Sequence, residues 1–409
     1  MKKVYFLVCY GAGHASMVAQ VYKEFAKNKD IKIVLLGLSI AQKYLNFLNI
    51  PHKSLSDYSE IIMDKESYEF GKILADKWHV DSSGISYSES IIYLGTSMRD
   101  LVTDNGKSKA FDLIDQKGRQ TFLPIMTMQK IINYESPNLI LATNAPRMER
   151  ASIIVGNKNN IPTINLHDDL GFMKRDYLLT GDKISVMSNI TKKNLIKQGH
   201  DNKKIVVNGH PAFDMIPKEL KQYDSLEIKK TNSLSNNSPC LLLGTSGGGE
   251  RGKIMDITKF VCDSVQKLDD RYQLIIKPHP GDDADAYRKF AESHPLHPKV
   301  ITDVNIRELL FVSEILVTFA STIMIEAALM SKPMISVNLT GKKNPLPFIK
   351  WGFGIEVKTQ SQFVKSVGYI LNDKEFKEKY KKARLNYFGN SIDGKASSRI
   401  VNMAYNLTE

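Results

Sequence analysis

Two hydroxyl residues and an acid stand where a strand-like segment gives way to a helix-like one. The segment 314–318, with an apolar centre, is short enough for a buried strand, and Ser321 and Thr322 follow as a helix-start signal. An apolar-periodic run then continues to a Lys-Pro pair, which places Glu326 about one turn inside the helix. The free N–H groups and positive end of a helix attract phosphate, and a carboxylate one turn further on can hold two sugar hydroxyls. The pattern indicates a nucleotide that carries a sugar.

A Lys-Pro-His-Pro turn upstream carries a second set of anion-binding residues. The apolar strand at residues 274–276 stops there, with Lys277, His279 and Pro280 in the turn. Because the prolines fix φ and withhold two N–H groups, the Lys and His side chains must supply any donors. At the carboxyl edge of a strand in an open α/β sheet, these side chains indicate phosphate contacts. The alternative is that His279 only caps a turn.

These two elements together resemble the C-terminal half of the GT-B glycosyltransferase superfamily. The Lys-Pro-His-Pro turn is most similar to the His-Pro motif of CDP-glycerol glycerophosphotransferases, bacterial polysialyltransferases and Kdo transferases. The resemblance extends over nearly the whole chain. It implies an α/β fold with two Rossmann-like domains facing each other across a cleft. It also implies that Lys277, His279, Pro280, Ser321 and Thr322 hold donor phosphate and that Glu326 holds ribose.

A Gly-rich loop follows the apolar segment at residues 240–243. Gly244, Thr245, Ser246 and Gly247 belong to this loop, which can cradle a pyrophosphate through backbone N–H groups. GT-B transferases use the equivalent loop in that way. Residues 247–253 also match a P-loop, but an Ile follows where a Ser or Thr must hold Mg²⁺, so an ATPase is excluded. A plain flexible loop is the alternative.

A second glycine loop, Gly11-Ala12-Gly13-His14, lies between the first expected strand and helix. Glycine lets the backbone approach a ligand, and the helix start favours anions. The third glycine of a dinucleotide fingerprint is missing, and no acid ends the second strand, so NAD binding is not expected. In GT-B transferases a Gly-rich loop with a trailing His faces the cleft. His14 is therefore a candidate for acceptor binding or general-base catalysis, with a helix cap as the alternative.

Acids that follow neighbouring strands complete the candidate catalytic set. Asp168 and Asp169 follow the expected strand at residues 161–166, so their carboxylates emerge at the ligand edge of the first domain. The alternative is that these acids only form a turn, because Asp-Asp before Leu-Gly is also common in turns. Arg147, after the strand at residues 139–144, could meet an anionic acceptor or pair with Glu149. No Asp-x-Asp with metal-ligand company stands at a strand end, so we expect a metal-independent site.

Alternating apolar runs and helical patterns predict parallel sheets wrapped by helices. The expected organisation is an acceptor-side domain (1–214), a linker (215–239), a nucleotide-donor domain (240–385) and a tail returning to the first domain (386–409). The linker assignment depends on a Ser-, Asn- and Lys-rich stretch at residues 224–239. Residues 208–214 resemble the Gly-turn-Asp segment that stands at this place in GT-B proteins and UDP-N-acetylglucosamine 2-epimerases.

Composition limits the compartment and the partners. A chain of 409 residues with 42% hydrophobic and 24% charged residues can bury two cores. Three widely spaced cysteines suit a reducing cytoplasm. The net charge of +12 comes from scattered lysines without a nucleic-acid motif. We therefore predict a cytoplasmic protein that binds no nucleic acid, with docking at an anionic inner membrane face as the second interpretation.

The sequence favours a GT-B enzyme that transfers a sugar or glycerophosphate to a surface glycan or glycolipid in capsule, lipopolysaccharide or teichoic-acid synthesis. A CMP-, CDP- or UDP-linked donor is expected as substrate, with no separate cofactor. A UDP-N-acetylglucosamine 2-epimerase is the first alternative, although its Asp-Ser-Gly-Gly-x-x-Glu-Glu pattern is replaced here by residues 319–327. A non-catalytic nucleotide-sugar-binding protein is the second.

Overall fold

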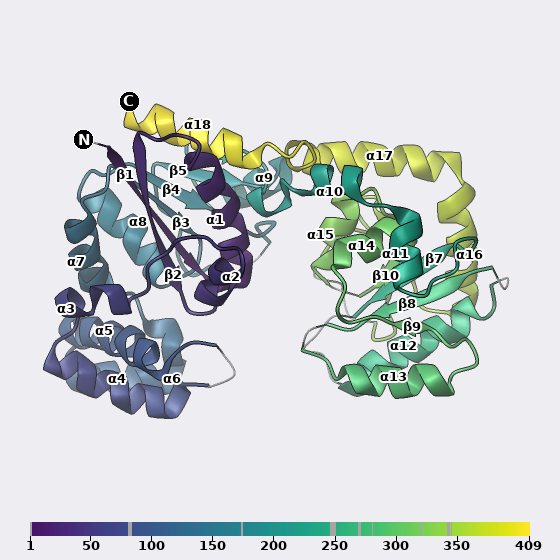
Figure 1. Ribbon diagram of the computed structural model, residues 1–409, viewed down its shortest axis with the longest axis horizontal. Helices are drawn as coiled ribbons and strands as arrows, with labels where there is room; N and C mark the ends of the chain where they lie inside the picture. The colour runs from purple at the N-terminus through teal and green to yellow at the C-terminus, as the bar shows by residue number, and fades with distance from the viewer. Residues whose placement is uncertain are drawn as a thin grey trace. The chain divides into compact units, whose positions relative to one another are not determined.

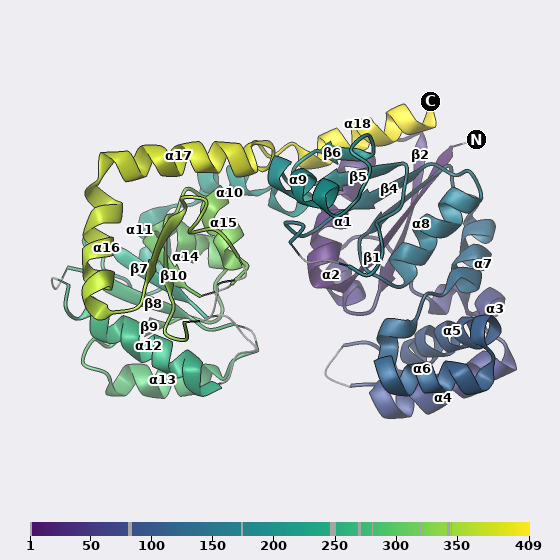
Figure 2. The same cartoon turned by 180° about the vertical axis from the view of Figure 1, so that it is seen from behind.

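The chain forms two compact α/β units, each with its own sheet. In the computed structural model, the described residues are 2–80, 84–172, 175–245, 251–268, 271–279, 281–319, 321–341, 344 and 346–409, without the side chains of 251–254. Unit 1 comprises Met1–Asp214 and Asn390–Glu409, and unit 2 comprises Met215–Gly389. Figures 1 and 2 show each unit from two sides. No helix among the described residues is long and apolar enough to cross a membrane.

Unit 1 is built on a parallel sheet in the order β2-β1-β3-β4-β5-β6. Its strands are β1 (Lys3–Tyr10), β2 (Ile31–Leu38), β3 (Leu139–Thr143), β4 (Thr163–Leu166), β5 (Lys183–Val186) and β6 (Ile205–Val207). The chain adds β2 on one side of β1 and β3 on the other, so the order reverses between β1 and β3. In open α/β sheets a ligand crevice forms at the carboxyl ends of the strands at such a point.

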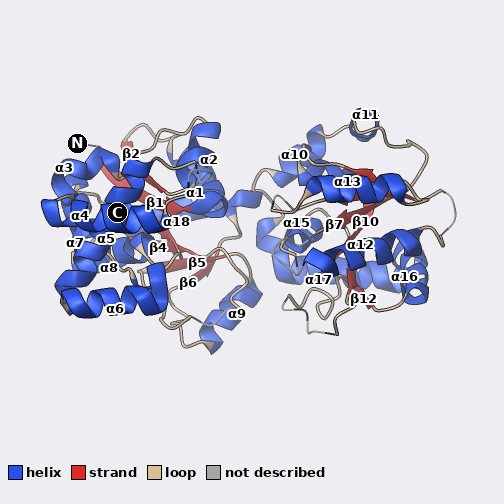
Figure 3. Ribbon diagram, turned by 90° about the horizontal axis from the view of Figure 1, so that it is seen from below, coloured by secondary structure: helices blue, strands red, loops and turns tan. Residues whose placement is uncertain are grey.

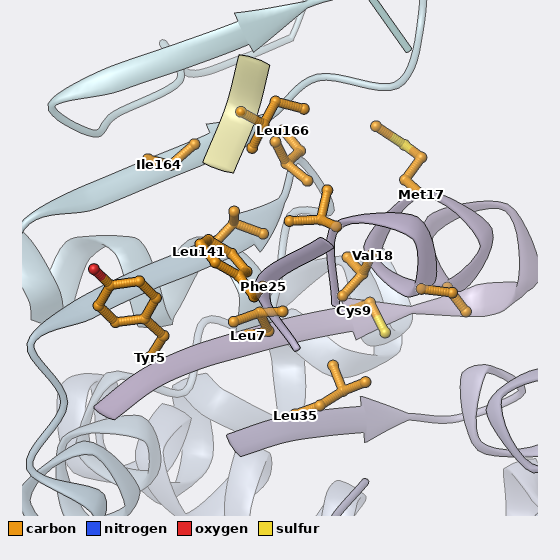
Figure 4. Packing of buried hydrophobic residues seen from close by; sticks show 14 of the residues in the cluster. Tyr5, Leu7, Cys9, Met17, Val18, Phe25, Leu35, Leu141, Ile164 and Leu166 are labelled. Atoms are coloured by element: carbon orange, nitrogen blue, oxygen red, sulfur yellow. The ribbon is translucent and has the colours of Figure 1, made fainter. Parts of the chain in front are cut away.

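Both faces of this sheet are buried, as a parallel sheet requires. Alternate residues of β1 point to opposite sides: Tyr5, Leu7 and Cys9 join one core, and Phe6 and Val8 join the other. The first core contains α1 (Gly11–Phe25), α2 (Ala41–Phe47) and the C-terminal helix α18 (Ala396–Thr408), and Figure 4 shows its packing. The second contains α7 (Ile125–Glu135) and α8 (Met148–Lys158).

A helical layer inserted between β2 and β3 has a smaller core of its own. It consists of η1 (Ser56–Tyr58), α3 (Ser59–Ile62), α4 (Lys65–Trp78), α5 (Tyr87–Asn105), α6 (Lys107–Lys117) and η3 (Gly118–Thr121), followed by α7. Phe70, Leu94, Met98 and Phe122 are buried at its centre. Gly71 and Gly95 allow α4 and α5 to pack closely, since a Cβ on either would lie within 2.2 Å of a backbone oxygen of the other helix. The long helical middle of the first half is therefore a distinct layer beside the sheet.

Unit 2 repeats the architecture with the sheet order β12-β11-β10-β7-β8-β9. The strands are β7 (Cys240–Gly244), β8 (Gln273–Lys277), β9 (Lys299–Val300), β10 (Ser313–Thr318), β11 (Met334–Val337) and β12 (Gly354–Val357). Its helices are α10 (Ile216–Gln222), α11 (Ser225–Thr231), α12 (Arg251–Val265), α13 (Ala284–Ser293), α14 (Ile306–Val312), α15 (Ile323–Leu329), α16 (Gln360–Asn372) and α17 (Lys374–Phe388). Figure 3 shows helices surrounding the strands in each unit. The predicted two-sheet α/β fold is confirmed.

Two local features differ from the sequence-based expectation. The first glycine loop is the opening turn of α1, which begins at Gly11 with φ of 82° and places His14 inside the helix. The segment expected to be a linker is largely helical, because α10 and α11 lie in it and Asp224 caps α11 by accepting from the N–H groups of Leu226 and Glu227. The polar composition of α11 resembles that of a linker, because most of its residues face solvent and Ile228 is buried.

The turn after β6 forms hydrogen bonds with the C-terminal segment. Asp214 accepts hydrogen bonds from the N–H groups of Ala396 (2.9 Å) and Ser397 (2.7 Å) at the start of α18. Arg399 Nε donates to the Asn208 carbonyl at 2.7 Å. Gly209 has φ of 93°, and a Cβ there would lie 2.1 Å from the Asn390 carbonyl oxygen. The Gly-turn-Asp segment thus anchors α18 to unit 1. The short helices η4 (Pro211–Phe213), η5 (Gly389–Ser391) and α9 (Asn189–Lys197) complete the fold.

Candidate functional site

His14 lies at the point where the strand order of the unit 1 sheet reverses. It follows β1, while Thr143 ends the adjacent β3 and Asp168 follows the next strand, β4. His14 Nε2 is 2.9 Å from Asp168 Oδ2, and its Nδ1 is 3.0 Å from Thr143 Oγ1. Parallel strands bring their carboxyl ends to one edge, which is why residues so distant in sequence meet. The structure therefore joins two of the residues predicted to be catalytic, His14 and Asp168.

A buried acid extends this pair into a chain of four groups. Thr143 Oγ1 donates to Glu149 Oε1 at 3.0 Å, and Glu149 Oε1 is 3.5 Å from His14 Nδ1. When both ring nitrogens of His14 carry protons, Nε2 donates to Asp168 and Nδ1 to Thr143, whose hydroxyl then donates to Glu149. The Glu149 side chain is 1% exposed, whereas that of Asp168 is 35% exposed. Asp168 therefore faces solvent and Glu149 lies behind the imidazole.

The two carboxylates favour the imidazolium form of His14. Burial alone would lower the pKa of His14, but hydrogen bonds and Coulombic attraction to Asp168 and Glu149 raise it to about 9. Burial would raise the pKa of Asp168, and its interactions with His14 outweigh that effect and hold the pKa well below its ordinary value. His14 and Asp168 therefore form an ion pair at neutral pH.

Glu149 and Asn144 were not identified as site residues from the sequence. The sequence indicates Glu149 only as a partner of Arg147, whereas its described side-chain partners are Thr143 and His14. Both amide atoms of Asn144 are buried without a hydrogen-bond partner in the described part of the chain, and the amide is near enough to Asp168 to lower its pKa. The sequence signal for these residues is the Thr143-Asn144 pair, which stands at the end of β3, the strand beside β1, and β1 leads into the helix that carries His14.

Asp169 has a different environment from its neighbour. It accepts from the Gly171 N–H and lies 3.4 Å from Arg175 Nη2, which are contacts typical of a turn. His167 is buried, its pKa is lowered by burial, and its Nδ1 contacts the Asp169 carbonyl oxygen. Single ligand atoms of His167, Asp168 and Asp169 lie within 4.8 Å of one another, as a metal site would need. Each of these side chains already has a protein partner, so the cluster gives no reason to assign a metal.

In unit 2 the predicted donor residues lie along the carboxyl edge of three adjacent strands. Thr245 follows β7, Lys277 ends β8, and Ser321 and Thr322 follow β10; these strands are neighbours in the order β10-β7-β8. Gly244 sits at the end of β7, and a Cβ there would lie 3.0 Å from Ile323 Cδ1 at the start of α15. The structure thus brings Gly244 and Thr245 to the same edge as the Ser-Thr turn. Ser246, Gly247 and Pro280 lie outside the described residues.

The turn after β8 orients His279 and restrains Lys277. The exposed His279 accepts a hydrogen bond from the Gly281 N–H at Nδ1 (3.0 Å), so its neutral form carries the proton on Nε2. Its backbone N–H donates to Thr245 Oγ1 (2.7 Å), which in turn donates to Asp282. Lys277 Nζ donates to the carbonyls of Thr302 and Val304, and burial lowers its pKa. In the described part of the chain, the Nε2–H of His279 is therefore available to a ligand, whereas two of the three N–H groups of Lys277 are already bonded to carbonyls.

Glu326 forms an ion pair that the sequence did not indicate. Arg307 Nε donates to Glu326 Oε1 at 2.9 Å, and Arg307 Nη1 donates to both oxygens of Glu219 at 3.1 and 3.0 Å. Burial would lower the pKa of Arg307, but the two carboxylates raise it. The pair fixes Glu326 in the first turn of α15, where its side chain is about a fifth exposed. Glu219 comes from α10, within the segment expected to be a linker.

Comparisons with known proteins identify the second half of the chain. Residues 249–406 match the family CDP-glycerol:poly(glycerophosphate) glycerophosphotransferase. The resemblance to glycerophosphotransferases, predicted from the Lys-Pro-His-Pro turn, is therefore confirmed, and the matched segment contains Lys277, His279, Ser321, Thr322 and Glu326. A comparison with curated protein sequences found no match.

Solved structures share the fold over almost the whole chain. UDP-GlcNAc 2-epimerase from Neisseria meningitidis, bound to UDP-GlcNAc, matches 98% of this chain and 100% of its own with a TM-score of 0.59 and 14% identity. The 2-epimerase from Methanocaldococcus jannaschii has a TM-score of 0.64 at 14% identity, covering 98% and 99%. Wall teichoic acid polymerase TagF, soaked with CDPG, has a TM-score of 0.54 at 11% identity, covering 99% and 88%. These similarities confirm the GT-B-like fold.

Proposed function

We propose that this protein transfers glycerophosphate from CDP-glycerol to a hydroxyl group of a cell-surface polymer. The observation that carries the proposal is the family match over residues 249–406, because this segment contains Lys277, His279, Ser321, Thr322 and Glu326. This match favours glycerophosphate over a sugar, the other transferred group that the sequence indicates. The His14–Asp168 pair supports a reaction that begins with proton abstraction from an acceptor.

The proposed reaction is a substitution at the phosphorus that bears glycerol. The acceptor oxygen forms a new P–O bond, and the bond from that phosphorus to the CMP phosphate breaks, with its electron pair leaving on CMP. The acceptor proton goes to His14, and the products are a phosphodiester and CMP. His14 accepts this proton only when it is deprotonated, and Asp168 then stabilises the imidazolium that forms.

On the donor side, His279 supports departure of CMP. Its Nε2–H is the free donor of the turn, and negative charge on the leaving phosphate grows toward the transition state. Ser321, Thr322 and the remaining N–H of Lys277 are proposed as further phosphate contacts, and Glu326, held by Arg307, as the ribose contact. Asp169 stays a weaker candidate for the base, since its contacts are those of a turn.

The test is CMP release from CDP-glycerol in the presence of a glycerophosphate-primed polymer. Radiolabelled glycerol should enter the polymer in step with CMP, and omission of the polymer should stop both. The same preparation should leave UDP-N-acetylglucosamine unchanged, because an epimerase would alter it without an acceptor. Epimerisation of that nucleotide sugar, with no CMP released from CDP-glycerol, would contradict the proposal.

A further inference from the structure

A cavity in unit 1 lies where the helical layer meets the sheet. It has a volume of about 190 Å³ and is lined by Tyr10 at the end of β1, Trp78 at the end of α4, Tyr93 of α5 and Arg119 of η3. Pockets for drug-sized ligands are about 300–1,000 Å³, so this cavity suits a smaller group. Tyr10 immediately precedes the helix that carries His14, so the cavity borders the carboxyl edge of the sheet.

Unused hydrogen-bond donors mark this cavity as a ligand site. The Tyr93 hydroxyl is buried without a hydrogen-bond partner among the described residues, and so is Nε of Arg147. Of these two residues only Tyr93 lines the cavity; Arg147 contacts the lining residue Tyr10, with its guanidinium 4.7 Å from the centre of that ring. An unsatisfied buried polar group costs about 1–3 kcal/mol, so a native protein usually provides a partner for it. Here the partner must accept hydrogen bonds.

The charge around the cavity selects an anion. Arg119 lies 5.9 Å from the centre of the Trp78 ring, and Arg147 adds a second guanidinium. Among the described lining residues the acid is Glu89, and its carboxylate already accepts from the N–H groups of Leu55 and Ser56 and from Gln42. The Arg119 guanidinium and the Tyr93 phenol, both in the lining, suit phosphate oxygens, and Arg147 adds positive charge beside Tyr10. The aromatic walls suit a short carbon skeleton.

We propose that this cavity binds a phosphorylated polyol, namely the terminal unit of the polymer that receives the transferred group. The identification of the polymer rests on the proposed function. Tyr93 and Arg119 contact the phosphate, Tyr10 and Trp78 pack against the carbon chain, and Arg147 adds charge at the Tyr10 side. These residues determine acceptor specificity and take no part in proton transfer.

Direct binding tests the site without any turnover. The full chain is titrated with glycerol 3-phosphate by calorimetry, in parallel with Tyr93→Phe, Arg119→Gln and the control Lys117→Gln. Lys117 is exposed, ends α6 two residues before Arg119 and does not line the cavity, so its variant removes a charge of the same sign outside the site. Each cavity variant should weaken binding about tenfold, the cost of one hydrogen bond to a charged group, while the control binds normally.

The outcomes separate the cavity from the proposed function. Equal affinity in wild type, Tyr93→Phe and Arg119→Gln overturns the site, and so does equal affinity for glycerol 3-phosphate and inorganic phosphate, because the polyol would then contribute nothing. Tyr93→Phe should not lower the melting temperature of the free protein, since it removes a buried hydroxyl that has no hydrogen-bond partner among the described residues. In turnover assays the cavity variants should raise KM for the polymer and not for CDP-glycerol. A third outcome is that the wild type binds glycerol 3-phosphate and the cavity variants do not, while the wild type releases no CMP from CDP-glycerol. That result would support the cavity as a binding site and contradict the proposed function.

Discussion

At the scale of single residues, the environment of His14 determines when it can act as a base. The imidazole must lose its proton before it can take one from the acceptor, and Asp168 and Glu149 raise its pKa to about 9. We therefore expect kcat/KM to rise about tenfold per pH unit below about pH 9 and to level off above it. A pH series at low acceptor concentration checks this. A profile that is flat from about pH 6 to 8 would exclude His14 as the base of the free enzyme.

The same pKa predicts how stability depends on pH. Because folding raises the pKa of His14 from 6.5 to about 9, the folded state holds the proton more tightly. The resulting stabilisation is fully present below pH 6.5 and is lost as the pH rises through about 9, and it is on the order of 3 kcal/mol. Denaturant unfolding of wild type and His14→Gln at several pH values measures this. If both proteins lose the same free energy of unfolding between about pH 6 and 10, the His14 ion pair is not stabilising.

His279 should affect turnover far more than stability. Its side chain is exposed and its Nε2–H faces away from the Gly281 contact, so His279→Ala removes a donor without opening a core. We expect turnover to fall about 10²–10³-fold, as on loss of one transition-state donor, with the melting temperature unchanged. His279→Gln places an amide N–H near the Nε2 position and should recover part of the rate. A lower melting temperature with normal specific activity would make His279 a structural residue.

At the scale of elements, strand ends were predictable and the contacts between them were not. The alternation of apolar runs with helical patterns predicted both sheets, and the runs of β1, β4 and β8 placed His14, Asp168 and Lys277 near strand ends. A linear pattern cannot show which strands are neighbours, so the Thr143–Glu149 extension behind His14 went unrecognised. For the same reason Arg307 was missed, because α14 meets α10 and α15 only in three dimensions.

Arg307 holds three helices of unit 2 together through two carboxylates. It lies in α14, Glu219 lies in α10 and Glu326 lies in α15, and its side chain is 15% exposed. Arg307→Gln should leave both acids without their charged partner and destabilise unit 2 by about 1–3 kcal/mol. Donor affinity should fall as well, because Glu326 loses its restraint. Thermal unfolding and nucleotide titration measure the two effects, and Arg307→Lys, which keeps the charge, should be milder in both. If Arg307→Gln has the stability and the nucleotide affinity of wild type, then the ion pairs of Arg307 with Glu219 and Glu326 contribute to neither.

At the scale of the whole molecule, the chain closes unit 1 with its last helix. Residues 390–409 belong to unit 1 although unit 2 separates them from residue 214 in sequence. Ile400, Val401 and Ala404 of α18 are buried in the same core as Tyr5 and Phe25. Unit 1 therefore acquires its complete core only when both ends of the chain have folded together. Unit 2, by contrast, is one continuous segment.

This connectivity predicts that two similar caps act on different units. Asp214 caps α18 in unit 1, and Asp224 caps α11 in unit 2, each by accepting two backbone N–H groups. Loss of a capping carboxylate costs about 1–2 kcal/mol. Calorimetry should show that Asp214→Ala lowers the transition of unit 1 and Asp224→Ala that of unit 2. Asp214→Asn keeps an acceptor oxygen, so it should lose less than Asp214→Ala. If Asp214→Ala instead lowered only the transition that Asp224→Ala lowers, α18 would stabilise unit 2 and the division at residues 214 and 390 would be wrong.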